Sequence, residues 1–356
     1  MAADVGFFAD HRRRNIGVLA ALALLSVLLA VAAVHEQASE LAPKYTPETY
    51  LPGIASRIAS ADRIHVTSAK GAFDVVKSAK GWVLPSRANY PASFDQVQKT
   101  LVGLAAFETI EPKTSRPDWF HYVGLDGPPR GSGVLIEVED HNGPIASVIL
   151  GRSEDIGDPS GALGLFARRS NENQSWLVRS VFEPKAGIGD WLDKSVISVD
   201  RARIEEVDVT PATGEAYVVK RDKPSDPDFK PMSLPPGRSL SDDAAADGVA
   251  SALTAFTFDD VQQASRLDFS KATRLVTKTF DGLAVTAEVV QKEADYWATI
   301  AATADPAAGD ATAEARQINA RAQGWAYKLP AYKGQQFMTS LDSLLKPVGA
   351  AAKTAQ

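Results

Sequence analysis

The chain has 356 residues, of which 45% are hydrophobic, and a formal net charge of -6 at pH 7. This length suits one large domain or two domains of roughly 150 residues each. The acidic balance argues against nucleic acid as a partner, because binding to a phosphate backbone needs clustered Lys and Arg. The sequence contains no Cys, which excludes disulfides, thiolate nucleophiles and Cys-ligated metal sites.

The strongest local feature is an uncharged apolar stretch, residues 16–34. Its length matches the roughly 20 residues with which a helix crosses the hydrocarbon core of a bilayer. Residues 1–15 are basic, whereas Glu36 and Glu40 follow the stretch. The positive-inside rule then places residues 1–15 in the cytoplasm and most of the chain in the periplasm. The sequence therefore predicts a single-pass transmembrane protein of the bacterial inner membrane.

A cleaved signal peptide is the alternative interpretation of this segment. Ala30, Val31 and Ala32 form an A-x-A-like site near the end of the apolar stretch. Signal peptides usually have shorter apolar cores of roughly 7 to 15 residues, which favours an uncleaved anchor. We expect residues 35–55 to form a linker.

The remainder of the chain contains an internal repeat. The segment from Ala61 to Lys77 aligns without a gap on the segment from Ile204 to Lys220. In this alignment Val75, Val76 and Lys77 match Val218, Val219 and Lys220. Both segments have the pattern of a strand, a turn containing Gly and a returning strand. Each copy is therefore predicted to begin with a β-hairpin.

A further short strand ending in Leu-Pro follows each hairpin. In the first copy it contains Trp82 and Leu84. In the second copy it contains Met232 and Leu234, and a loop rich in Pro and Asp, residues 222–231, precedes it.

A helix is predicted next in each copy. In the first, Ser93 with Gln96 fits a capping box, and apolar residues recur at three- and four-residue spacing from Phe94 to Leu104. In the second, a similar stripe follows Asp242, and Leu253 and Phe256 align with Leu104 and Phe107.

Two strands joined by a tight turn complete the common part of each copy. The turns are Asn142-Gly143 and Asp281-Gly282, which are dipeptides typical of two-residue hairpins. The fold class predicted is α+β, with two tandem β-hairpin/helix/β-hairpin units that form antiparallel sheets. The first unit is expected at residues 56–197 and the second at 198–346, followed by a flexible tail at 347–356.

The end of the second copy adds two elements. Trp325, Tyr327 and Leu329 alternate on one face of a strand. A last amphipathic helix is predicted through Phe337 and Leu344.

Patterns that indicate catalysis or metal binding are lacking. The five His residues have no helical ligand spacing, and the sequence has no H-E-x-x-H, G-x-S-x-G, P-loop or G-x-G-x-x-G motif. His65 is predicted to be an ordinary strand residue. We therefore expect a non-enzymatic protein with no catalytic, cofactor-binding or metal-binding residues. An enzyme that uses two carboxylates alone remains an alternative, although the sequence singles out no such pair.

Three polar or aromatic segments are candidates for surface features. The acidic loop of Glu154, Asp155 and Asp158 has no EF-hand spacing and is interpreted as a solvated turn. Arg168 and Arg169 are interpreted as part of an exposed hairpin tip. The aromatic run is the candidate for partner or ligand contact, and it consists of Trp119, Phe120, His121 and Tyr122.

These features resemble a bacterial family known as domain of unknown function 4340. The resemblance lies in the N-terminal anchor, the paired hairpins, Gly81-Trp82 and the stretch from Tyr122 to Pro128, and it spans residues 54–347. It implies an envelope protein found in company with gliding-motility-type ABC export systems and their auxiliary subunits. It also implies a packing role for Tyr122. Arg266 stands in the second copy where the first has Gly124, so we expect the two turns to differ.

Two functions follow as hypotheses. The leading one is an accessory or interaction subunit of an ABC-type export system, whose partners are the membrane and transporter permease or auxiliary subunits. The other is a periplasmic module that binds a glycan, lipid or peptide in a cleft between the two repeats, since domain interfaces favour such clefts.

Overall fold

The computed structural model describes residues 26, 27, 29, 30 and 46–347. Apart from four residues, the predicted anchor at 16–34 lies outside the described part, as do residues 1–15, the linker up to residue 45 and the tail from residue 348. None of the helices in the described part is long and apolar enough to cross a membrane.

A nine-stranded antiparallel sheet forms the first unit. Its strand order is β4-β3-β2-β1-β6-β7-β8-β9-β5. The strands are β1 (Arg63–Ser68), β2 (Gly71–Ser78), β3 (Gly81–Leu84), β4 (Tyr90–Pro91), β5 (Glu108–Pro112), β6 (Val134–Asp140), β7 (Gly143–Asp155), β8 (Leu163–Arg169) and β9 (Ser175–Ser180).

An eight-stranded antiparallel sheet forms the second unit, in the order β12-β11-β10-β14-β15-β16-β17-β13. Its strands are β10 (Ile204–Thr210), β11 (Tyr217–Lys220), β12 (Lys230–Pro231), β13 (Asp260–Gln263), β14 (Thr273–Thr279), β15 (Leu283–Lys292), β16 (Asp295–Ala304) and β17 (Trp325–Leu329). Apart from the short β4, the two orders agree strand for strand, as a duplicated unit requires. The protein is therefore α+β with two antiparallel sheets.

The strand register corrects the gapless alignment of the two hairpins. Ile64 pairs with Val75, and its counterpart Val207 pairs with Val219. Val75 and Val219 are both fully buried, whereas Val218 was the predicted match. The alignment was wrong by one residue in the returning strand, because the connection after Val209 is longer than the two-residue turn between β1 and β2.

The helices of the first unit lie on both faces of its sheet. On one face, α3 (Phe94–Ala105) buries Val97 and Leu104. The Ser93 hydroxyl caps α3 by accepting from the Gln96 amide at 3.2 Å. The reciprocal half of the predicted capping box is missing, because the Ser93 amide donates to the Trp191 carbonyl. The other helical segments of this unit are α2 (Ile54–Arg57), η1 (Ile58–Ser60), η2 (Pro85–Arg87), η3 (Pro117–Trp119), α4 (Phe120–Val123) and η4 (Ile188–Trp191).

The second unit differs most from the prediction in its helices, which are η5 (Arg201–Arg203), α5 (Asp247–Ala250), η6 (Ala264–Arg266), α6 (Gly309–Ala322), α7 (Ala331–Phe337) and α8 (Leu341–Leu344). The helix expected after Asp242 is the single turn α5, although its stripe residues Leu253 and Phe256 are buried as predicted. The last helix is divided into α7 and α8.

Helix α6 was not predicted. Its buried side is made by Ala311, Ala315, Ile318 and Ala322, and such an Ala-rich stripe gives a weak hydrophobic period. The helix packs against β15 and β16.

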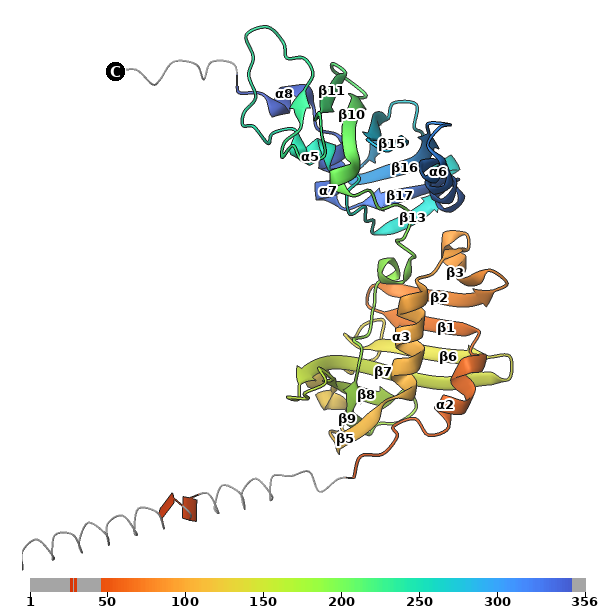
Figure 1. Cartoon of the computed structure of the whole chain (residues 1–356). Helices are drawn as coiled ribbons and strands as arrows, with labels where there is room; N and C mark the ends of the chain where they lie inside the picture. The colour runs from red at the N-terminus through yellow and green to blue at the C-terminus, as the bar shows by residue number, and fades with distance from the viewer. Residues whose placement is uncertain (1–25, 28, 31–45, 348–356) are drawn as a thin grey trace, which may run out of the picture.

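The two units are joined by a packed seam, and Figure 1 shows them arranged along a curve. The ring of Tyr90 lies edge-on to Trp325 with centroids 5.0 Å apart. Its hydroxyl donates to the Asp193 carbonyl at 2.8 Å, and burial raises the pKa of Tyr90 above its ordinary value. At Gly189, a Cβ atom would lie 2.3 Å from the Asp259 carbonyl oxygen. This close backbone approach has room only for glycine.

Candidate functional site

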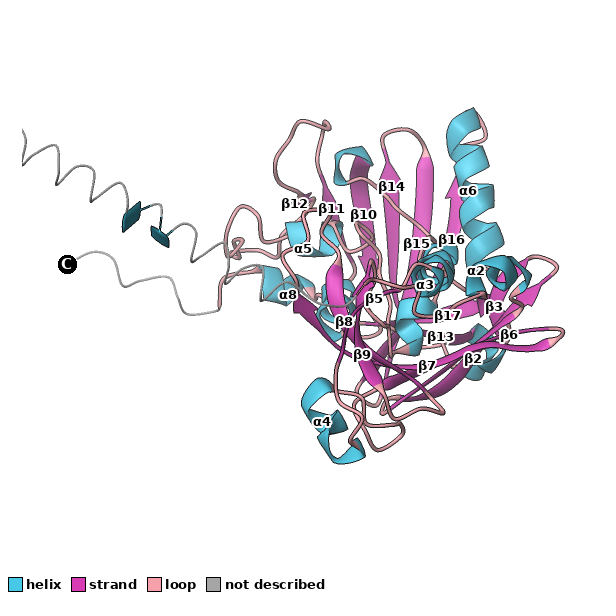
Figure 2. Cartoon of the chain, turned by 90° about the horizontal axis from the view of Figure 1, so that it is seen from below, coloured by secondary structure: helices cyan, strands magenta, loops and turns pink. Residues whose placement is uncertain are grey.

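The predicted aromatic contact residues lie together at the end of η3 and in α4, on the face of the first sheet opposite α3 (Figure 2). Phe120 is buried, and its ring lies 4.7 Å below the Arg168 guanidinium. It belongs to a second small core with Leu125, Ile149, Phe166 and Leu177.

The exposed members of this cluster are Trp119 and Tyr122, at 48% and 61% of their surface. The packing role implied for Tyr122 was therefore wrong, since Phe120 has that role. Trp119 stacks under Arg116 at 4.7 Å, and His121 lies 3.8 Å from Tyr122 between ring centroids.

The polar segments singled out in the sequence have structural partners. Asp158 accepts from Arg179 at 2.6 Å, and this hydrogen bond holds the pKa of the Asp158 carboxyl well below its usual range. Arg168 is partly buried and donates to the Leu125 carbonyl. The interpretation of Arg168 as part of a solvated tip was wrong, because its guanidinium packs over the ring of Phe120.

His65 lies within β1 and pairs across the hairpin with Asp74, at 2.8 Å between Nδ1 and the carboxylate. The prediction of a sheet residue is confirmed. Among the residues from 46 to 347, no group of three or more His, Asp or Glu side chains is placed to hold a metal ion.

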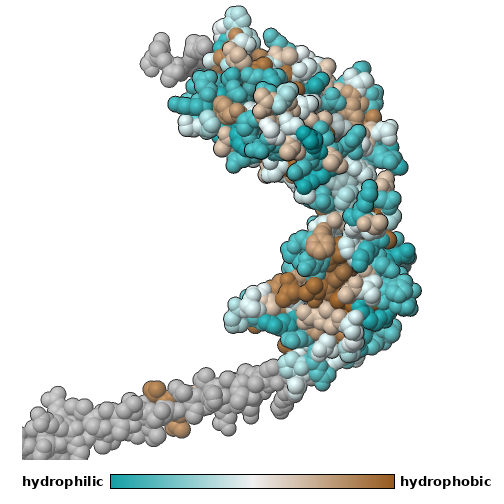
Figure 3. All heavy atoms as spheres, turned by 45° about the vertical axis from the view of Figure 1, so that its right-hand side comes forward, coloured by the Kyte–Doolittle hydropathy of each residue, from teal (hydrophilic) through white to brown (hydrophobic). Residues whose placement is uncertain are grey.

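An apolar groove lies beside α3 in the first unit, and we call it the α3 groove. It has a volume of about 300 Å³. Figure 3 shows apolar side chains gathered on the surface of this unit. Phe94 and Val102 line the groove from α3 with 68% and 53% of their surface exposed. The remaining lining residues include Ile58, Lys77, Trp82 and Leu101.

Gly103 explains how α3 presents these residues. A Cβ atom at this position would lie 2.2 Å from the ring of Phe182. The chain after β9 thus packs closely against one side of α3, and Phe182 stacks on Phe107 with centroids 5.7 Å apart. The side of the helix with Phe94 and Val102 stays uncovered.

The second unit has a counterpart of this groove, which the register identifies. The Lys77 amide donates to the Asp62 carbonyl, and the Arg221 amide donates to the Glu205 carbonyl. Lys77 therefore corresponds to Arg221.

The third strand extends this correspondence. Val76 pairs with Val83 in the first unit, and Lys220 pairs with Lys230 in the second. The residues one step earlier, Trp82 and Phe229, therefore correspond. This corrects the predicted match of Trp82 with Met232.

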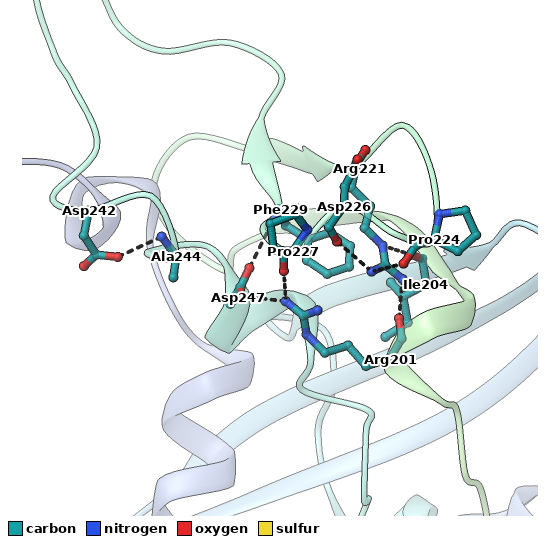
Figure 4. Close-up of polar contacts among 10 residues, drawn as sticks. All are labelled: Arg201, Ile204, Arg221, Pro224, Asp226, Pro227, Phe229, Asp242, Ala244 and Asp247. Carbon is teal, nitrogen blue, oxygen red and sulfur yellow. Dashed lines mark hydrogen bonds and ion pairs between the residues drawn. The ribbon is translucent and has the colours of Figure 1, made fainter.

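In the second unit this position is closed by the unit's own chain, as Figure 4 shows. Phe229 is fully buried, with the guanidinium groups of Arg221 and Arg201 at 4.7 and 5.3 Å from its ring. Arg201 pairs with Asp247 at 2.5 Å. The same carboxylate accepts from the Phe229 amide at 2.9 Å. An aromatic ring, two cations and a carboxylate thus form one closed cluster.

Arg221 holds the inserted loop over this cluster. Its guanidinium donates to the carbonyls of Pro224 and Asp226 at 3.3 and 3.2 Å, and to that of Ile204 at 2.7 Å. Only 4% of Arg221 is exposed, and burial lowers its pKa. A cation in such a position is tolerated because carbonyl oxygens satisfy it.

A third feature is a cleft at the seam, with a volume of about 480 Å³. It lies between η2 of the first unit and the sheet edge of β13, β17 and β16 in the second. Arg87 bridges it through two bonds to Asp260, at 2.5 and 2.9 Å. Trp297 and Arg266 also line it, and the exposed Arg266 guanidinium has no ion-pair partner within residues 46–347. A cleft therefore lies between the two units, and binding of a ligand in it stays a prediction.

Sequence reasoning missed the α3 groove. The predicted stripe includes Phe94 and omits Val102, although the buried side of α3 is formed by Val97, Thr100, Gly103 and Leu104. An apolar residue beyond a complete stripe is the signal that identifies such a surface.

The comparisons with known proteins give one result. The family model described as Domain of unknown function (DUF4340) matches residues 82–278, which is more than half of the chain. Comparison with curated proteins and with solved structures gives no match. The matched range begins at Trp82 in the α3 groove and ends at Lys278 in β14. The chain therefore belongs to the DUF4340 family.

Proposed function

We propose that this protein is a non-enzymatic interaction subunit of the bacterial envelope. Residues 16–34 anchor it in the inner membrane, its two units lie in the periplasm, and the α3 groove binds a protein partner. The observation that carries the proposal is the exposure of Phe94 and Val102 beside a groove of about 300 Å³. Contiguous exposed apolar surface typically marks an interaction site, because leaving it in water costs free energy.

The position of the groove in the chain supports a membrane partner. Ile58, which lies in η1 and lines the groove, is 24 residues (58 minus 34) after Val34, the end of the predicted anchor. An extended chain spans at most about 3.6 Å per residue, so the groove stays within roughly 90 Å of the anchor. We expect the periplasmic parts of ABC transporter permease or auxiliary subunits, the partners implied by the family resemblance, to lie within that reach.

A crosslinked pull-down of the tagged full-length protein from its own membranes tests the proposal. We expect mass spectrometry to identify permease or auxiliary subunits. Their recovery should fall at least tenfold for Phe94→Asp and for Val102→Asp, since a buried carboxylate opposes docking. Tyr332→Asp is the matched control, because Tyr332 is 57% exposed but lies on α7 of the second unit.

Two results would contradict the proposal. Recovery of the protein only as a free monomer would contradict the proposed interaction function. Equal recovery of partners with the groove variants would move the contact away from α3.

The seam cleft favours a second function, a ligand-binding module. Trp297 offers an aromatic surface there, and Arg266 offers a cation without an ion-pair partner in the described part of the chain. We expect envelope extracts to raise the melting temperature of the full-length protein and to have less effect on Trp297→Ala. If such extracts do not change the melting temperature of the wild-type protein, the ligand-binding function is contradicted.

A further inference from the structure

We infer that the α3 groove receives a proline-containing acidic loop segment of a partner protein. This inference rests on the proposed interaction function and adds the chemistry of the segment that the partner supplies. The second unit shows what such an occupant looks like, because a loop of its own chain covers the corresponding position.

The covering loop in the second unit is residues 222–228, with the sequence DKPSDPD. It is held by its backbone carbonyls, since Arg221 binds those of Pro224 and Asp226 and Arg201 binds that of Pro227 at 2.6 Å. The loop turns at residues 223–226, where the Asp226 amide donates to the Lys223 carbonyl at 3.0 Å, and its prolines have no N–H to satisfy. A segment of this kind presents carbonyl oxygens to cations without leaving its own donors unsatisfied.

The first unit has the receiving surface but not the loop. Its β2 and β3 are joined by a tight turn in which Ser78 pairs with Gly81. This turn is too short to fold back over Trp82. The position that residues 222–228 cover in the second unit is therefore an open groove in the first.

The side chains of the α3 groove suit the same class of segment. The Lys77 ammonium, in the position of Arg221, is exposed and has no carboxylate partner in the described part of the chain. Trp82, in the position of Phe229, is partly buried and lines the groove together with Leu101. Aromatic-lined grooves bind proline-rich segments, and an unpaired cation at the edge attracts carbonyl or carboxylate oxygens.

A second copy of this chain is a poorer occupant. The one loop known to fit, residues 222–228, is already held within its own unit by Arg201 and Arg221. To dock in another molecule, it would have to leave these contacts and expose the buried Phe229.

The test measures binding of a fluorescein-labelled peptide with the sequence of residues 222–231 to the full-length protein in detergent, by fluorescence anisotropy. We expect saturable binding that weakens at least tenfold with Lys77→Glu and with Val102→Asp. Tyr332→Asp should leave it unchanged. A peptide in which Lys replaces the three Asp residues should lose binding to the wild type and regain it with Lys77→Glu. Failure of the wild-type protein to bind the peptide, or equal binding by the Lys77→Glu variant, would overturn the inference.

A photoreactive benzoylphenylalanine at position 94, activated in native membranes, identifies the natural occupant. Crosslinks to a proline- and Asp-containing segment of another protein support the inference, whereas lipid adducts or crosslinked copies of this chain overturn it. The two experiments distinguish failure of this inference from failure of the proposed interaction function. If the peptide does not bind but partners are still lost from the pull-down with Val102→Asp, the interaction function stands and only the chemistry of the segment is wrong.

Discussion

The two units of this protein have the same strand order, but the surface at Trp82 in the first unit is open and the corresponding surface at Phe229 in the second is covered. In the second unit, Phe229 is fully buried beneath Arg201, Arg221 and the inserted loop. In the first, Trp82 and Lys77 line an open groove. A duplicated fold therefore carries one closed and one open version of a site. This difference supports our proposal that the first unit uses the surface for binding, whereas the second uses it for stability.

The largest expected difference between the units concerns the aromatic residue. Phe229→Ala should destabilise the protein by about 3–5 kcal/mol, because it empties a fully buried site. Trp82→Ala should cost about 1–2 kcal/mol, since its ring is only partly removed from water. Urea denaturation of the full-length variants measures both. Equal losses would show that the first groove is as closed in solution as the second.

The neighbouring cations give the next comparison. Arg221→Met should cost about 1–3 kcal/mol, because it leaves buried carbonyl oxygens without a donor. Lys77→Met should change the free energy of unfolding by less than about 0.5 kcal/mol, as is usual for an exposed side chain. The same denaturation series tests this pair. A large effect of Lys77→Met would mean that its ammonium has a structural role in the first unit.

Each unit also has a glycine in its core helix, and these glycines should respond in opposite directions. Gly103→Ala should cost about 1–3 kcal/mol, because the new Cβ overlaps the ring of Phe182. Gly248→Ala has open space around its Cβ and should stabilise the protein by about 0.5–1 kcal/mol through helix propensity. Thermal unfolding should show one melting temperature below the wild-type value and one above it. A loss of stability at Gly248 would indicate that α5 needs the flexibility of glycine.

The candidate site was only partly accessible from the sequence. The aromatic run from Trp119 to Tyr122 was found, but which of its rings is buried was not, because that depends on Arg168 from β8 folding over Phe120. The correspondence of Trp82 with Phe229 was missed because the loop predicted at residues 222–231 includes Phe229 and β12, so the strand was placed three residues too late, at Met232. Only backbone pairing reveals that shift.

The sequence by itself determined the α+β class, the duplication and the hairpins, because alternating apolar residues and Asn-Gly or Asp-Gly turns are local signals. It also supplied the prediction of an anchor at residues 16–34. The tertiary structure decided which surfaces remain open. Whether Phe94 is exposed or Phe229 is buried depends on chain segments far away in the sequence, such as Arg201 and the segment after β9. Burial is a property of these long-range contacts, and no local pattern contains them.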